Sequence, residues 1–118
     1  MEIAVDREGE VTVIRLSGEV DASNSAEAGQ RLREAAPEER PRVVLDMSDL
    51  RFLDSSGLAA LIAFLKDVDA RGGQAALARL QPTVHRIFEL TRLDQVFHLY
   101  SRLEEALQHL GVPGAEER

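Results

Sequence analysis

Cysteine is absent from this sequence of 118 residues. Its absence excludes a disulfide framework, a thiolate metal site and a cysteine nucleophile. Apolar residues make up 44% of the chain, which is enough for a core that needs no such cross-links. The length fits one ordinary domain and leaves little room for a second.

Long apolar runs are also missing. A transmembrane helix needs about 20 consecutive, predominantly apolar residues, and no stretch of this chain reaches that length. The N-terminal segment MEIAVDREGE lacks the basic start of a secretory signal peptide. We therefore expect a cytoplasmic protein without membrane insertion.

Positive charge is scarce. The chain has 14 basic and 21 acidic side chains, a net charge of −7, and Lys66 is its only lysine. Nucleic acids and anionic membranes attract clustered Lys and Arg, so this balance predicts no direct binding to nucleic acid. It suits a protein partner with a basic patch, although an acidic surface also serves solubility alone.

Signatures of catalysis and cofactor binding are missing as well. The nucleophile elbow of serine hydrolases needs G-x-S-x-G, but Leu53 stands where the first glycine would fall. His85, His98 and His109 lie in the last third of the chain, and none has an obvious orienting partner. Metal-ligand spacings and both glycine-rich phosphate-binding signatures are absent. The sequence therefore predicts a protein that is not an enzyme and that has no metal and no cofactor.

Strand and helix periodicities alternate along the chain. Segments 2–6 and 10–20 are rich in β-branched residues and predict a hairpin. The patterns that follow are helix 24–36, strand 42–47, a helix of about sixteen residues ending before Arg71, strand 74–80, a helix from Pro82, strand 96–100 and helix 101–110. This order predicts an α/β fold, a single domain whose mixed, mostly parallel sheet starts with a hairpin and is covered by about four helices. The domain is expected to span residues 1–110, with a flexible tail at 111–118.

Two of the predicted helices begin with a capping-box pattern. In a capping box, the N-cap side chain and an acidic side chain three positions later each bond the other residue's backbone amide. The pairs are Asn24 with Glu27 and Ser101 with Glu104. Both helices are therefore predicted to start at a side-chain cap.

The segment LDSSGL joins a predicted strand to a predicted helix and supports two interpretations. In the structural one, Asp54 or Ser55 is the N-cap, and Gly57 lets the first turn pack closely against a neighbour. In the functional one, a serine here accepts a phosphate, because a helix N-terminus favours negative charge. A phosphoserine would bring about −1.5 to −2 charges and three acceptor oxygens, enough to prevent docking on an apolar surface.

A second polar cluster follows the strand 10–20 and contains Glu19, Asp21, Ser23 and Asn24. By itself it is a typical helix start. Loops beyond the carboxyl ends of neighbouring parallel strands lie on the same side of a sheet. If strands 10–20 and 42–47 are neighbours, this cluster and LDSSGL form one surface.

Several motifs in this order resemble the STAS domain, and within it the small bacterial anti-sigma factor antagonists. The strongest is FLDSSGL, which is similar to the family's aliphatic-Asp-Ser-Ser/Thr-Gly-Leu junction. Supporting motifs are L-x-G-E-V-D and V-L-D-M-S-D-L. The resemblance runs from about Val5 to Leu110, which is nearly the whole chain.

The resemblance implies a phosphorylation switch at Ser55. In such antagonists, a partner serine kinase that is also the anti-sigma factor modifies the serine directly after the aspartate. The unmodified antagonist binds this partner and frees a sigma factor, the phosphorylated form lets go, and a serine phosphatase resets it. ATP would belong to the kinase. The resemblance and the two polar clusters together predict partner contacts at Glu19, Asp21, Ser23, Asn24, Leu53, Asp54, Ser56, Gly57 and Leu58.

Two alternatives remain open from the sequence. The first is a STAS subunit of a stress-signalling scaffold or of a lipid-transport ATPase complex, because such proteins share the fold. The second is a small hydrolase using Ser55 or Ser56, which would need a base within about 2.6–3.2 Å of the serine hydroxyl.

Overall fold

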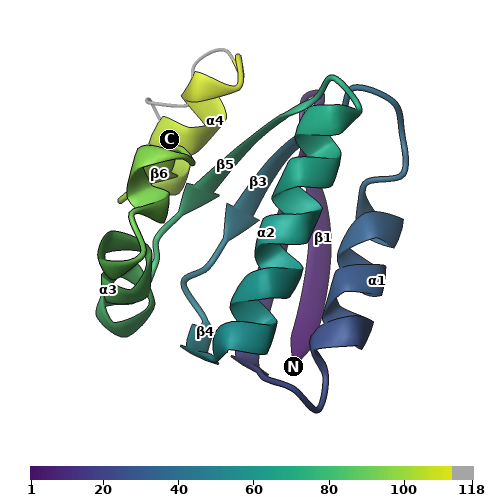
Figure 1. The fold of residues 1–118 in the computed structure, drawn as a ribbon. Coiled ribbons are helices and arrows are strands. Elements are labelled where there is room, and N and C mark those ends of the chain that lie inside the picture. The colour runs from purple at the N-terminus through teal and green to yellow at the C-terminus, as the bar shows by residue number, and fades with distance from the viewer. Residues whose placement is uncertain (113–118) are drawn as a thin grey trace.

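The computed structural model describes residues 1–112 and contains a sheet between helices (Figure 1). The strands are β1 (Glu2–Glu8), β2 (Val11–Val20), β3 (Arg42–Asp46), β4 (Leu50–Leu53), β5 (Gln74–Ala78) and β6 (Leu99–Tyr100). The helices are α1 (Ser25–Ala35), α2 (Ser55–Ala70), α3 (Pro82–Leu90), a short 3-10 helix η1 (Leu93–Gln95) and α4 (Leu103–His109). None of the helices in this part of the chain is long and apolar enough to cross a bilayer.

The sheet has the order β1-β2-β3-β5-β6. β1 and β2 form an antiparallel hairpin, whose turn contains Gly9 at a positive φ of 61°. The pairs β2–β3, β3–β5 and β5–β6 are all parallel. The predicted mixed, mostly parallel sheet with a leading hairpin and four α-helices is therefore confirmed.

Alternation along β2 divides the core between the two faces of the sheet. Ile14 and Leu16 lie in the larger cluster, which α1, α2 and α3 complete with Leu32, Phe64 and Phe88. Val11 and Val13 lie in the smaller cluster, which α4 covers. β3 contributes to both clusters, because residues that alternate along a strand point to opposite faces. A strand buried on both faces explains the continuous apolar run in the sequence.

The structure corrects the prediction in three places. Residues 50–53, to which the sequence assigned no strand, form β4, which pairs in parallel with the end of β2. The last strand is only two residues long. Neither capping box forms, because Asn24 and Ser101 make no cap hydrogen bond and α4 starts after Arg102. In both cases other polar groups compete for the side chain that would have capped the helix.

The segment directly after the last helix packs against the sheet as far as Val112. Val112 is buried in the cluster beneath α4, and its amide donates to the Leu107 carbonyl at 3.1 Å. Of the predicted tail 111–118, Gly111 and Val112 are described, and residues 113–118 lie outside the described residues.

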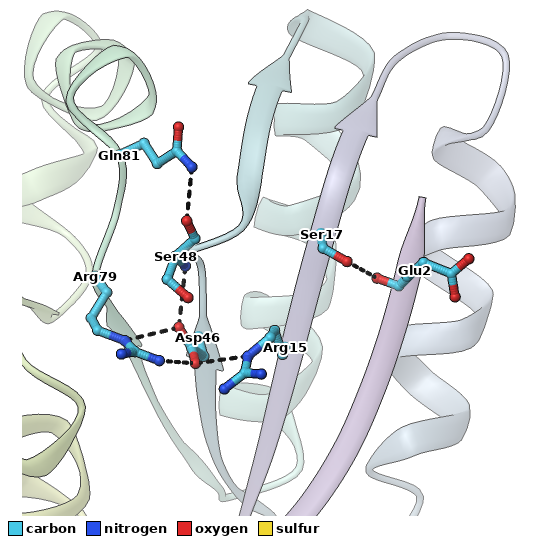
Figure 2. A network of polar contacts seen from close by, with 7 residues as sticks. All are labelled: Glu2, Arg15, Ser17, Asp46, Ser48, Arg79 and Gln81. Atoms are coloured by element: carbon cyan, nitrogen blue, oxygen red, sulfur yellow. Dashed lines mark hydrogen bonds and ion pairs between the residues drawn. The ribbon is translucent and has the colours of Figure 1, made fainter.

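A buried carboxylate fastens the loops at the carboxyl end of the sheet (Figure 2). The Asp46 side chain has no exposed surface and accepts from Nε and Nη2 of Arg79, at 3.2 Å and 2.5 Å, and from Nε of Arg15, at 3.2 Å. It also accepts from the Ser48 amide, while Gln81 donates to the Ser48 carbonyl. Burial alone would raise the pKa of Asp46, but the Arg79 and Ser48 hydrogen bonds outweigh it and lower that pKa.

We predict that Asp46→Asn destabilises the fold at pH 7 by about 1–3 kcal/mol, because it removes charge-assisted bonds while the guanidinium groups stay half-exposed. Because the pKa of Asp46 is lower in the folded state, its stabilisation is complete above the unfolded-state pKa of about 4. It is lost as the pH falls through the folded-state value. Urea unfolding at pH 7 and pH 3 measures both effects.

Asp69→Asn is the matched control for this experiment, because Asp69 is exposed and its side chain makes no hydrogen bond or ion pair within residues 1–112. We expect the control to change stability by less than about 0.5 kcal/mol. If Asp46→Asn lowers the free energy of unfolding equally at both pH values, the charge of this carboxylate is not the source of the stability.

Candidate functional site

The pairing of β4 with β2 brings the two predicted polar clusters together. Val20, the last residue of β2, lies opposite Leu53, the last residue of β4. The Asp54 amide continues this pairing and donates to the Val20 carbonyl at 3.2 Å. The segment after β2 and the start of α2 are therefore neighbours, as the parallel arrangement of the strands predicts.

The side chain of Asp54 connects these two segments. One carboxylate oxygen accepts from the Gly57 amide at 2.9 Å, which makes Asp54 the N-cap of α2. The other oxygen accepts from the Ala22 amide at 3.2 Å. One carboxylate thus caps the helix and ties it to the segment of Glu19, Asp21, Ser23 and Asn24, here called the acidic loop. The sequence left the cap open between Asp54 and Ser55, and the structure shows that it is Asp54.

Gly57 permits the close approach of the helix to β2. A Cβ atom at this position would lie 2.5 Å from the Val20 carbonyl oxygen and 2.8 Å from Cδ1 of Leu53. Such distances are far inside van der Waals contact, so no other residue fits without a shift of backbone. Gly57 and Leu53 are both buried and hold the site from beneath, whereas Leu58 is half-buried.

The two serines differ in exposure. Ser55 is the first residue of α2 and is exposed, whereas Ser56 is half-buried. Within residues 1–112, the Ser55 hydroxyl makes no hydrogen bond, so it is available to a reaction partner. Among the first three amides of the helix, Asp54 bonds only that of Gly57, and those of Ser55 and Ser56 have no acceptor within residues 1–112.

The acidic loop is ordered by its own side chains. Asp21 accepts from the amide of Ser23 at 2.9 Å and from its hydroxyl at 2.5 Å, and these bonds lower the pKa of Asp21. Asn24 accepts from the Asp21 amide and donates to the Glu19 carbonyl. These bonds explain why Asn24 does not cap α1. Glu19 and Ser23 are exposed at the surface.

Phe52 is the residue of this face that the sequence reasoning missed. It precedes Leu53 in β4 and is 47% exposed, so an aromatic side chain stands beside the acidic loop. Aromatic residues are only 4% of the chain. The position of an aromatic residue directly before the polar helix start could therefore have indicated a role for Phe52 in binding. The signal was not used, because the sequence assigned no strand to residues 50–53 that would place Phe52 on this surface.

The histidines take part in other contacts. His85 lies beside Glu89 on α3, and the rings of His98 and His109 face each other with centroids 4.3 Å apart. No hydrogen bond joins a histidine to Ser55 or Ser56 within the described part of the chain. The residues described here supply neither serine with the base that a hydrolase needs.

Residues 2–106 match the family described as STAS domain. The chain belongs to the STAS domain family. It is 30% identical, over 95% of its length and 97% of the relative's, to a protein of Paenibacillus polymyxa named anti-sigma F factor antagonist.

Solved structures agree with this assignment. The crystal structure of an anti-sigma factor antagonist from Mycobacterium paratuberculosis has a TM-score of 0.82 at 29% identity and covers 92% of both chains. The Bacillus cell fate determinant SpoIIAA in its phosphorylated form has a TM-score of 0.70 over 92% of this chain and 99% of that one. At 22% identity, the second comparison shows a shared fold and nothing more.

We predict that Gly57→Ala destabilises the protein by about 1–3 kcal/mol, although alanine favours helices, because its methyl group would meet the Val20 carbonyl. The control is Gly29→Ala in α1, where the nearest atom is the flexible Arg33 guanidinium at 3.3 Å. That variant should be neutral or more stable by up to about 1 kcal/mol. Urea unfolding of both variants tests the pair, and equal effects would contradict the close approach at Gly57.

Proposed function

We propose that this chain is an anti-sigma factor antagonist and that phosphorylation of Ser55 switches it off. Its unphosphorylated form would bind an anti-sigma factor that is also a serine kinase, releasing a sigma factor in the cytoplasm, and a serine phosphatase would reset it. The observation that carries the proposal is the exposed Ser55 hydroxyl at the start of α2, which makes no hydrogen bond within residues 1–112 and lies beside the acidic loop. Similarity to a protein named anti-sigma F factor antagonist supplies the class of partner.

The phosphorylation step needs nothing from this chain except its hydroxyl. The Ser55 oxygen attacks the γ-phosphorus of ATP held by the kinase, an oxygen–phosphorus bond forms, and the bond to the β-phosphate oxygen breaks. ADP leaves, and the serine proton passes to a base of the kinase. The role assigned to this chain is that of a substrate and binding partner, not of a catalyst.

We call the surface formed by the start of α2, Phe52 and the acidic loop the docking face. A phosphate at Ser55 would change the charge and hydration of this whole face. The amides of Ser55 and Ser56 in the first helical turn would stabilise the new dianion. The carboxylates of Glu19, Asp21 and Asp54 already make this face negative, so the partner would meet a strongly anionic, hydrated group beside Phe52. The partner would then no longer bind, because the phosphate group is bulky and its desolvation is costly. The fold itself would persist.

We predict one phosphate on Ser55 after incubation with ATP and an anti-sigma kinase from the same organism. Ser55→Ala should accept none, and the matched control Ser56→Ala should still accept one. Intact mass and phosphosite mapping give the result. A phosphate on Ser56, or none with a kinase that is active on another substrate, would contradict the switch and favour the scaffold or transport alternative.

The same variants separate the switch from folding. Because Asp54 is the cap and the Ser55 hydroxyl makes no hydrogen bond in the described part of the chain, Ser55→Ala should change stability by less than about 0.5 kcal/mol. This is less than the loss of a cap would cost. Ser55→Ala should retain kinase binding, and Ser55→Asp should weaken it severely.

We predict that Phe52→Ala weakens binding to the anti-sigma kinase about fivefold or more, because exposed aromatic side chains are frequent anchors of interfaces. The matched control is Val96→Ala, since Val96 is 66% exposed but lies beside the other end of α2. Calorimetric titration of both variants, with urea unfolding to show intact folds, gives the comparison. Equal affinities for the two variants would remove Phe52 from the interface.

A further inference from the structure

A concave site lies at the far end of α2 from Ser55. Its cavity has a volume of about 560 Å³, within the range that holds small molecules. The apolar part of the wall includes Leu65 from α2 and Phe97 from the segment before β6. α2 has sixteen residues and is about 24 Å long, so this cavity is well separated from the docking face.

The polar part of the wall concentrates side chains that are rare in this chain. Lys66, the only lysine, and His98 and His109, two of the three histidines, all line the cavity. Lys66 has no ion pair within residues 1–112, so its charge is not already neutralised by a neighbour there. Asp69 is the single carboxylate among the described lining residues. In a protein of net charge −7, this is a local excess of groups that are cationic or can become so.

The histidine pair is held by the fold. The His98 carbonyl accepts from the Leu77 amide at 2.8 Å, which fixes this residue to β5, and His109 is the last residue of α4. The His109 ring also lies 5.5 Å from the Tyr100 ring. Burial, with a smaller contribution from His98, lowers the pKa of His109. A proton on His109 is therefore unfavourable unless a negative charge lies nearby.

We infer that this cavity binds a small amphipathic anion, with its apolar body against Leu65 and Phe97 and its anionic head at Lys66, His98 and His109. An anion beside the rings compensates the charge that a proton on His109 brings, so binding and protonation of His109 favour each other. Affinity therefore rises as the pH falls from 8 to 6, where carboxylic acids remain ionised. Lys66, Asp69 and Tyr100 are the other ionisable groups that lie near the pair.

The test uses the full chain and decanoate as the probe, followed by NMR of the backbone amides. Saturable shifts are expected in the cavity, with several-fold tighter binding at pH 6 than at pH 8. Decanol, which has the apolar body without the charge, should bind at least about tenfold more weakly at pH 6. Lys66→Gln combined with His109→Gln should weaken decanoate binding about tenfold or more, and urea unfolding verifies that this variant folds.

The matched control is His85→Gln, which removes the one histidine outside the cavity and should leave decanoate binding unchanged. Absence of saturable shifts, equal binding of decanol, or an affinity independent of pH would each overturn the inference. Phosphorylation of Ser55 is a separate measurement at the other end of α2, so failure of either proposal leaves the other standing.

Discussion

The backbone carbonyl of Val20 is the point on which the proposed switch depends. It ends β2, accepts the Asp54 amide at 3.2 Å, and lies only 2.5 Å from where a Cβ of residue 57 would stand. The hydrogen bond fixes the entry into α2, and the close approach at Gly57 fixes the first turn of the helix. Because backbone groups, the Asp54 cap and the lack of a side chain at Gly57 hold the turn, the Ser55 hydroxyl makes no hydrogen bond within residues 1–112.

The carboxyl end of the sheet is fixed by a different device. The charge of Asp46 is buried, which is costly by itself, and two arginines and the Ser48 amide compensate it. This network holds the segment between β3 and β4 against the segment after β5 (Figure 2). The network therefore braces the segment that leads into β4, and through β4 it also fixes the start of α2. The bracing explains how a four-residue strand can set the geometry of a docking face.

The sequence predicted the elements whose signals are local. Apolar periodicity in 58–68, the stop at Arg71 and the alternation along 10–20 each follow from backbone geometry, and each is found in the structure. It failed where two polar groups competed, as at Asn24, whose side chain serves the acidic loop and not α1. It failed also at β4, because a strand of four residues without regular alternation gives no periodic signal.

The sequence by itself determined the class of the fold, the family, and the residues of the two polar clusters. Motif order, strand periodicity and the Asp-Ser-Ser-Gly junction are all written in the chain locally. Only the tertiary structure decided that Asp54 is the cap, that its second oxygen reaches Ala22, and that Phe52 stands exposed beside the acidic loop. The same holds for the cavity that gathers Lys66, His98 and His109. These facts join residues distant along the chain, and their proximity follows from strand pairing and helix packing that no local pattern specifies.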